Sequence, residues 1–281
     1  MTLRHSICNE AFEKWPFADA CRAIRKIGYT GIEIAPFTLA EKPSEITAAA
    51  RREYARIMQA EGLTFVGLHW LMMSPPGLHV TTPDAGLRRR GWQHIRDLID
   101  LCADLDPDAV GSDGAGGKSV MVFGSPKQRC TTGGLSRAEA TRHMAEGLAS
   151  VAPQAAERGV TVLLEALPLN QCDVVQTLEE AAGIVDEIDS PAIQTMFDVH
   201  NAIDEREPLD ALIERWFTHI RHVHVNELDG RHCGAGDYDF RPILQALRRL
   251  NYSGWVSLEA FDFSYGAERL AEESLRHLES L

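Results

Sequence analysis

The 281-residue sequence lacks both a long apolar run and an excess of positive charge. Its apolar runs, such as Val120–Phe123, are far shorter than the roughly 20 residues of a membrane-spanning helix. The opening stretch MTLRHSICNEAF lacks the apolar core of about 7–15 residues that signal peptides contain. The 28 Lys and Arg residues against 41 Asp and Glu residues give a formal net charge of −13. We therefore expect a cytoplasmic protein that binds neither membranes nor nucleic acid.

The cysteines include no CxxC pair. The six are scattered along the chain at Cys8, Cys21, Cys102, Cys130, Cys172 and Cys233. A chain of this length buries a core that needs no disulfide bonds for stability. We therefore expect reduced and mostly buried thiols, and no cysteine-based zinc site.

Short apolar runs alternate with longer amphipathic ones along the whole chain. The short runs predict strands at His5–Cys8, Gly31–Ala35, Thr64–His69, Ser119–Phe123, Thr161–Glu165, Ile193–Asp198, His219–Val225 and Trp255–Glu259. The amphipathic stretches predict helices at Phe17–Ile27, Pro43–Ala60, Leu87–Leu105, Arg137–Arg158, Leu178–Ile188, Pro208–Phe217, Phe240–Leu250 and Glu268–Leu281. The near-continuous apolar character of the short runs is typical of parallel strands covered on both faces.

Several predicted helix ends carry capping signals. Ser136 and Glu139 match a capping box, and Asp84 and Asp239 are candidate N-caps of two other helices. Three glycines follow predicted helix ends, where a left-handed residue is favoured: Gly28, Gly62 and Gly159. These signals support the predicted helix boundaries.

Eight consecutive β-then-α units predict a single (β/α)8 TIM-barrel domain over residues 1–281. A doubly wound open sheet is the alternative, but such a sheet usually carries a glycine-rich phosphate turn after its first strand. Here the first predicted strand runs into Asn9–Phe12, which contains no glycine. The segment Asp106–Lys118 is rich in Gly and Asp, and we expect it to be a surface insertion on the face away from catalysis.

Polar side chains close several of the predicted apolar strands. Glu165, Asp198, His224 and Glu259 stand at or near the ends of strands five to eight. In a barrel, the carboxyl ends of the strands meet at the mouth that holds the catalytic groups. A carboxylate at the end of a buried strand is costly unless it is paired or bound to metal. The set therefore predicts one divalent metal ion, Mn²⁺ first, with Mg²⁺, Co²⁺, Fe²⁺ or Zn²⁺ as alternatives.

Other polar residues near strand ends leave alternatives open. His222 and His224 point the same way because they are two residues apart on a strand, and His222 is either a packed interior residue or a partner of the metal ligand. Lys127 and Arg129 follow the fourth strand and would hold an anion or form a solvated basic loop. Glu33 closes the second strand and would support the site, contact substrate or form a buried ion pair.

The strand-end motifs resemble those of the xylose isomerase-like TIM barrels. The resemblance rests on LLEALPLN, MFDVHN, VSLEAF, and HVHVNE with GAGDYDF after it. This superfamily includes sugar isomerases, ketose 3-epimerases, inosose dehydratase and endonuclease IV-type nucleases. In its sugar epimerases the equivalent Glu, Asp, His and Glu ligate one divalent metal, and the two glutamates act as acid and base. The resemblance implies Glu165, Asp198, His224 and Glu259 as metal ligands, with Glu165 and Glu259 catalytic.

The surroundings of the substrate depart from those of the ketose 3-epimerases. In those enzymes a substrate-contacting His stands three residues after the strand-six Asp, where this chain has Asn201. A second Glu follows the strand-five ligand there, where this chain has Asn170 and Gln171. A simple hexulose 3-epimerase is therefore not implied. The candidate substrate-binding residues are His69, Lys127, His200 and Arg231.

We expect a metal-dependent sugar or sugar-phosphate isomerase or epimerase. It would remove a proton next to a carbonyl through a metal-stabilised enediolate, with Glu165 and Glu259 as the acid and base. The alternative is a dehydratase or lyase acting on a keto-polyol or keto-glycoside. An endonuclease IV-like nuclease is a remote alternative, with His69, Asp229 and His232 as extra metal ligands. The expected partner is a small carbohydrate, and barrels of this group often form dimers or tetramers.

Overall fold

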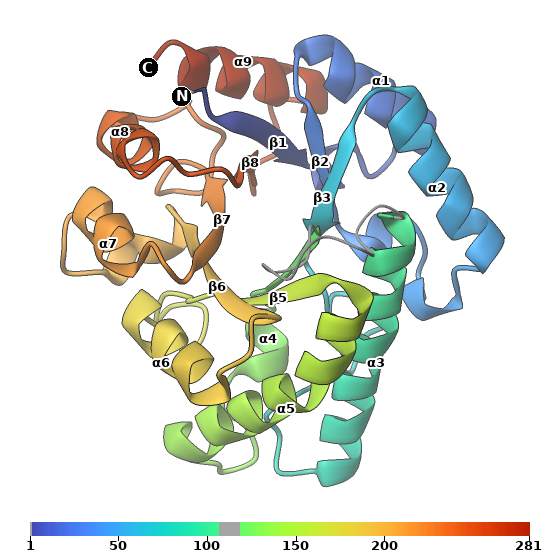
Figure 1. Cartoon of the computed structure of the whole chain (residues 1–281), viewed down its shortest axis with the longest axis vertical. Helices are drawn as coiled ribbons and strands as arrows, with labels where there is room; N and C mark the ends of the chain where they lie inside the picture. Colours follow the sequence, from blue (N-terminus) through green and yellow to red (C-terminus); the bar gives the residue numbers. More distant parts are fainter. Residues whose placement is uncertain (1, 107–118) are drawn as a thin grey trace.

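Eight parallel strands form a closed barrel in the computed structural model, which describes residues 2–106 and 119–281 (Figure 1). The strands follow one another around the barrel in chain order, and β8 pairs with β1 to close it. They are β1 Arg4–Cys8, β2 Gly31–Ile34, β3 Thr64–Leu68, β4 Ser119–Phe123, β5 Val160–Leu164, β6 Ile193–Asp198, β7 Ile220–Val225 and β8 Trp255–Leu258. The predicted (β/α)8 barrel is confirmed.

Helices cover the outside of the barrel (Figure 1). They are α1 Phe17–Ile27, α2 Ala48–Ala60, α3 Ala85–Leu105, α4 Pro126–Arg129, α5 Arg137–Arg158, α6 Leu178–Ile188, α7 Leu209–Trp216, α8 Arg241–Arg249 and α9 Ala267–Glu279. The four-residue helix α4 was not predicted, because one turn is too short to show a helical period. It lies directly after β4 and contributes to the loops at the carboxyl end of the barrel.

Most predicted boundaries agree with the structure within one or two residues. The predicted helix Pro43–Ala60 begins late, at Ala48, because Thr47 accepts a hydrogen bond from the backbone N–H of Ala50 and caps the helix there. The prediction that Asp239 is an N-cap is wrong. Phe240 occupies the N-cap position of α8. Asp239 lies one residue before it, and its side chain accepts a hydrogen bond from the backbone N–H of Arg241.

The other predicted caps are present. Ser136 and Glu139 form the capping box of α5. Asp84 accepts hydrogen bonds from the backbone N–H groups of Gly86 and Leu87 at 2.7 and 3.0 Å and caps α3. Gly159 ends α5 with a φ of 68°, a left-handed conformation that glycine adopts without strain.

Apolar side chains fill part of the barrel interior. One interior cluster consists of Val66, Val120, Val122, Leu163 and Met196. Strands β3 and β4 approach closely at Gly67, where a Cβ atom would lie 2.0 Å from the carbonyl oxygen of Val120. Glycine is therefore required at that crossing. A second, larger core lies between the strands and the surrounding helices.

Three further predictions concern membrane-spanning helices, the insertion and the cysteines. None of the helices in the described residues is both long and apolar enough to cross a membrane. The predicted insertion Asp106–Lys118 lies outside the described residues except for Asp106, which accepts a hydrogen bond from the Ser119 hydroxyl at 2.6 Å. The cysteines are free thiols, and all but Cys130 are buried.

Candidate metal centre

Four of the predicted site residues lie at the carboxyl ends of four neighbouring strands, and we call them the mouth tetrad. Asp198 closes β6 and pairs in register with His224 on β7. Glu165 directly follows β5, and its backbone N–H donates to a carbonyl of β4 at 3.3 Å. Glu259 directly follows β8, and its backbone N–H donates to a carbonyl of β7 at 3.3 Å. Strand register therefore places all four residues at one end of the barrel.

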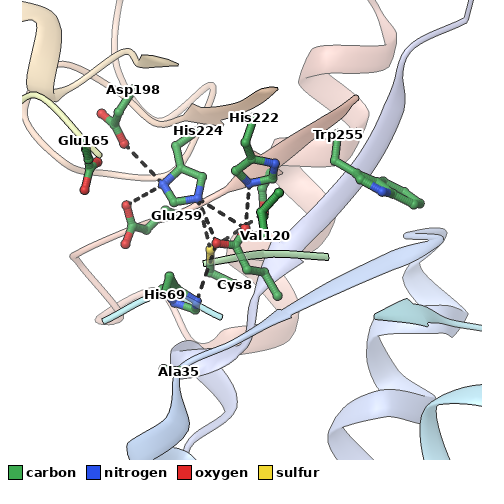
Figure 2. A network of polar contacts seen from close by, with 12 residues as sticks. Cys8, Ala35, His69, Val120, Glu165, Asp198, His222, His224, Trp255 and Glu259 are labelled. Carbon is green, nitrogen blue, oxygen red and sulfur yellow. Dashed lines mark hydrogen bonds and ion pairs between the residues drawn. The ribbon is translucent and has the colours of Figure 1, made fainter. Parts of the chain in front are cut away.

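The side chains of the mouth tetrad converge. One ligand atom from each of the four residues lies within 4.8 Å of those of the other three. His224 Nδ1 lies 2.9 Å from Glu259 Oε2 and 3.6 Å from Asp198 Oδ2 (Figure 2). Glu165 and Glu259 are each 6% exposed, and His224 is fully buried. Three carboxyl groups and one imidazole thus share a space almost closed to water.

The mouth tetrad holds more negative charge than its own imidazole offsets. Burial and, to a smaller extent, repulsion from Glu259 and Asp198 together raise the pKa of Glu165 to about 8. Burial also raises the pKa of Glu259, against the attraction of His224. Burial alone would lower the pKa of His224, but Glu33 and Glu259 hold it well above its usual value. In the protein alone, protons offset this excess of negative charge.

The donor set of the mouth tetrad fits a divalent metal ion. Three carboxylates and one imidazole form a hard-leaning oxygen and nitrogen set, which suits Mn²⁺, Mg²⁺, Co²⁺ and Fe²⁺. A bound cation would replace the protons that the raised pKa values favour, because metal ligands must be deprotonated. Oxygens of Glu165, Asp198 and Glu259 together with Nδ1 of His224 would hold it.

A second buried group lies next to the tetrad inside the barrel, and we call Glu10, Glu33, His69 and His222 the inner cluster. Glu33 on β2 is fully buried and faces two imidazoles, with His222 Nε2 at 2.8 Å and His224 Nε2 at 3.1 Å. Burial would raise the pKa of Glu33, but His224 and His222 hold it well below its usual value. The ionised carboxylate of Glu33 accepts a hydrogen bond from the Nε2–H group of His224. This contact leaves Nδ1 of His224 turned toward the mouth tetrad.

The rest of the inner cluster continues this network. His69 Nε2 lies 2.8 Å from Glu10 Oε2, and both side chains are buried. His69 Nδ1 lies 3.8 Å from Glu33 Oε1, so His69 stands between the two carboxylates. Cys8 lies beside them, with Sγ 4.0 Å from His224 Nε2, and burial raises its pKa to about 12, which keeps it a thiol.

Two asparagines hold the carboxylates of the tetrad. Asn201 Nδ2 donates to Glu165 Oε1 at 2.8 Å, and the backbone N–H of Asn201 donates to Asp198 Oδ1 at 2.8 Å. Asn226 Nδ2 donates to the backbone carbonyl of Glu259 at 2.9 Å and to Asp198 Oδ2 at 3.4 Å. These amides orient the carboxylates without adding charge.

A cavity opens beside the mouth tetrad. Glu165 and Glu259 line it together with Asn201, Trp70 and Phe261. The rings of Trp70 and Phe261 meet edge to face, with centroids 6.2 Å apart, and form an aromatic wall. The cavity therefore combines two carboxyl groups with an apolar wall, as sites for small polar molecules with apolar faces do.

The candidate substrate contacts are placed differently from one another. His69 lines the cavity. His200 lies at its edge, where its ring centroid is 5.2 Å from that of Phe261 and its Nδ1 is 2.7 Å from the carbonyl oxygen of Leu228. Lys127 is exposed on α4 and is not among the cavity-lining residues described.

The loop after β7 engages its polar residues in local pairs. Arg231 Nε donates to Asp229 Oδ2 at 2.8 Å, and Arg231 does not border the cavity in the described part of the chain. His232 Nε2 lies 3.0 Å from Glu273 Oε2 on α9. Asp229 and His232 thus have other partners, although a nuclease would use them as metal ligands.

Family membership follows from a comparison that covers most of the chain. The family model described as "Xylose isomerase-like TIM barrel" matches residues 21–281. The chain belongs to this family. The matched range contains the whole mouth tetrad, so the resemblance seen in the strand-end motifs is confirmed at the level of the family.

Several sugar epimerases are similar to this member of the family. The chain is 24% identical over 196 residues to a ketose 3-epimerase of Arthrobacter globiformis. The aligned region covers 68% of this chain and 63% of that enzyme. The chain is 23% identical over 262 residues to 3-dehydro-D-guloside 4-epimerase of Escherichia coli, which covers 89% of each chain. The crystal structure of a D-psicose 3-epimerase in the presence of D-fructose superposes with a TM-score of 0.82 and 19% identity, covering 99% of this chain and 98% of the other.

Sequence reasoning missed parts of this family member's site. Glu10 is the second residue after β1, so a strand-end rule widened by one residue would have found it. Asn226 follows β7 in the same way. Arg129 carries no such signal. The sequence leaves open whether it holds an anion or lies in a solvated basic loop. In the structure it is fully buried, and its guanidinium donates to the carbonyls of Phe123 at 3.0 Å and Val175 at 3.3 Å.

Proposed function

We propose that the chain is a divalent-metal-dependent sugar epimerase or isomerase that acts on a carbon next to a carbonyl. The observation that carries the proposal is the mouth tetrad, which presents two carboxyl groups to one cavity beside a set of metal ligands. Glu165 comes from the end of β5 and Glu259 from the end of β8. The two groups therefore approach a molecule in the cavity from different strands, as an acid and a base on two faces of one carbon require.

A divalent cation held by the tetrad would polarise the substrate carbonyl and acidify the neighbouring C–H bond. Within the protein, one glutamate accepts that proton on a carboxylate oxygen and the other returns a proton to the opposite face. Raised pKa values suit both tasks, because they bring a carboxyl group closer to both accepting and donating a proton. The pKa of Glu165 is about 8, and burial also raises that of Glu259. Asn201 fixes one oxygen of Glu165 and leaves the other to face the cavity.

The relatives support a sugar ketone as the substrate class. The names of both enzymes place the inverted carbon beside a ketone, at C3 of a ketose in one and at C4 of a 3-dehydro-glycoside in the other. The aromatic wall of Trp70 and Phe261 suits the apolar C–H face of a sugar ring or chain. We therefore propose a ketose or a keto-glycoside as substrate, with inversion next to the carbonyl.

Exchange of substrate protons tests the proposal directly. Protein stripped with EDTA and then loaded with Mn²⁺ or Mg²⁺ is mixed with keto-sugars, their phosphates and 3-keto-glycosides in D₂O, and proton NMR follows the C–H next to the carbonyl. We expect deuterium incorporation and an epimer or isomer with the loaded protein only. Glu165→Gln and Glu259→Gln should abolish exchange, whereas Glu187→Gln, on the exposed surface of α6, should not.

Three outcomes would contradict the proposal. Exchange that continues after the metal is stripped would remove the metal requirement. A product lighter by one water would indicate a dehydratase on the same site. Retained activity in both Glu→Gln variants would show that the two glutamates are not the acid and base.

A further inference from the structure

Two cysteines from different loops meet at the carboxyl end of the barrel, outside the mouth tetrad. Cys130 directly follows α4, and Cys172 lies in the loop between β5 and α6. Their sulfur atoms lie within 4.8 Å of each other. Cys130 Sγ also lies 3.4 Å from the carbonyl oxygen of Gln171, the residue before Cys172. The two thiols stand 42 positions apart in the sequence, and only the fold brings them together.

Residues next to the two cysteines hold the two loops together. Asp173 accepts hydrogen bonds from both the backbone N–H and the hydroxyl of Thr131, the first of them at 2.9 Å. Thr131 follows Cys130 and Asp173 follows Cys172, so the loops are tied one residue away from each sulfur. The thiol of Cys130 donates to the carbonyl of Pro126 at 2.8 Å within its own helix turn.

A buried cation stands beside this pair. Arg129 is fully buried and donates to two backbone carbonyls, while its Nε has no hydrogen-bond partner. Within the described residues, no carboxylate forms a hydrogen bond or an ion pair with it, although its charge lowers the pKa of the nearby Glu165. A buried guanidinium without a counterion is costly, and the sulfur of Cys172 offers the missing negative charge. The neighbouring side chain of Cys130, and then the charge of Arg129, lower the pKa of Cys172 to about 6 despite its burial.

The same geometry disfavours a metal ion at this pair. Cys130, Cys172 and Asp173 have the spacing of ligands. However, Asp173 is already engaged by two donors of Thr131, and the guanidinium of Arg129 would repel a cation. A thiolate next to a second thiol and a fixed positive charge is instead the environment of a reactive cysteine.

We propose that Cys130 and Cys172 are a hydroperoxide-reactive dithiol that closes reversibly to a disulfide. The Cys172 thiolate attacks one oxygen of hydrogen peroxide, the O–O bond breaks, and with one proton the products are a sulfenic acid and water. The Cys130 thiol then attacks that sulfur, and a second water leaves as the disulfide forms. In sum, two thiols and one hydrogen peroxide give one disulfide and two waters. Cys130 is partly exposed, which gives the small oxidant a route to the pair.

The other thiols of the chain provide internal controls. Burial raises the pKa of Cys8 and Cys21 to about 12 and holds those of Cys102 and Cys233 well above the usual value. At neutral pH these four remain protonated and unreactive, because the thiolate is the nucleophile. Selective oxidation of two of the six cysteines is therefore expected.

The test treats the full-length reduced protein with one equivalent of hydrogen peroxide at pH 7, followed by alkylation and peptide mass mapping. We expect one cross-linked peptide pair, Cys130 with Cys172, that dithiothreitol restores. The rate of thiol oxidation in Cys172→Ser should be lower by about tenfold or more, because the remaining thiols are protonated. Cys130→Ser should accumulate a sulfenic acid at Cys172 that dimedone traps. The matched control, Cys21→Ser, should form the cross-link at the wild-type rate.

Several results would overturn the assignment. One is thiol loss spread over the buried cysteines, and another is equal reactivity of wild type and Cys172→Ser. A third is a tightly bound zinc ion, found in the purified protein and lost in Cys130→Ser, because it would make the pair a metal site. Each variant is first checked for an unchanged circular dichroism spectrum and melting temperature, so that misfolding is recognised separately.

Discussion

The mouth tetrad and the inner cluster lie side by side in one barrel, where His224 of the tetrad contacts Glu33 of the inner cluster, yet they balance their charge in opposite ways. In the inner cluster each carboxylate faces an imidazole, with His69 beside Glu10 and His222 beside Glu33. In the mouth tetrad three carboxylates surround one imidazole. The pKa of Glu33 is accordingly held low by its histidines, whereas that of Glu165 is raised by burial and by the other two carboxylates.

This difference supports a structural role for the inner cluster and the proposed metal-binding role for the mouth tetrad. In the inner cluster each carboxylate has an imidazole as hydrogen-bond partner, so the cluster stabilises the fold without a ligand. The mouth tetrad keeps an excess of negative charge that a divalent cation would offset, so its free energy falls on binding. The shared imidazole couples the two, because Glu33 fixes its Nε2 and so directs its Nδ1 to the mouth. The predictions below test this contrast, from the largest effect to the smallest.

Removing a carboxylate from the mouth tetrad should have the largest effect on binding. We expect Asp198→Asn to weaken Mn²⁺ binding by about a thousandfold, or about 4 kcal/mol, because it loses a charged ligand. Isothermal titration calorimetry with the stripped protein measures the change. The metal-free stability should stay near that of wild type. An Mn²⁺ affinity within about threefold of wild type would show that the mouth tetrad does not differ from the inner cluster by binding a metal ion.

Removing the charge of Glu33 should instead destabilise the fold. Glu33→Gln leaves His222 and His224 without their anion in a buried site, which costs about 3 kcal/mol of unfolding free energy. Urea unfolding of the metal-free protein measures this loss. Metal affinity should also fall, by about tenfold or more, because His224 is less firmly oriented. If Glu33→Gln left stability unchanged, the inner cluster would not be the structural element that its contacts indicate.

The metal-free protein should lose stability as the pH rises through the range in which Glu165 titrates. The pKa of Glu165 is about 8 in the fold and lies near 4.5 in the unfolded chain, so the folded state holds an extra proton between these values. Unfolding free energy should therefore decrease by about 2 kcal/mol from pH 5 to pH 7. The titration of Glu33 does not mask this loss of stability. Its pKa is lowered in the fold, so it changes stability only at pH values below the usual pKa of a glutamate. Glu165→Gln should flatten the slope, and saturating Mn²⁺ should reverse it.

Loss of an orienting amide should have the smallest effect. Asn201→Ala removes the donor to Glu165 and should cost about 1 kcal/mol of stability. A double-mutant cycle with Glu165→Gln isolates this hydrogen bond, and we expect a coupling energy of similar size. Independent, additive effects of the two substitutions would show that Asn201 does not act through Glu165.

Much of the fold was predictable from local patterns. All eight strands were found within one residue, because buried parallel strands are short apolar runs bounded by polar turns. Both predicted ends of helices α1, α5 and α6 agree with the structure, because amphipathic periodicity is strong there and capping signals are local. Helix α4 was not, because its single turn, PKQR, carries no apolar period.

The residues of α4 also show where local reasoning fails. Lys127 and Arg129 look alike in sequence, as two basic residues after a strand. Two positions apart on a helix they point in different directions, and the structure exposes Lys127 and buries Arg129. Only the packing of the β5–α6 loop decides which of the two contacts Val175 and lies beside Cys172.

The sequence by itself determined the eight β/α units, the barrel class and the four residues of the mouth tetrad. Each of these depends on signals within a few residues, and strand ends in a barrel share one face. The tertiary structure alone decided which side chains meet across the barrel, since Glu33 and His222 are 189 residues apart in sequence. It also decided the pairing of Cys130 with Cys172. Closure of the barrel and the packing of its loops create these contacts, and neither leaves a periodic pattern in the sequence.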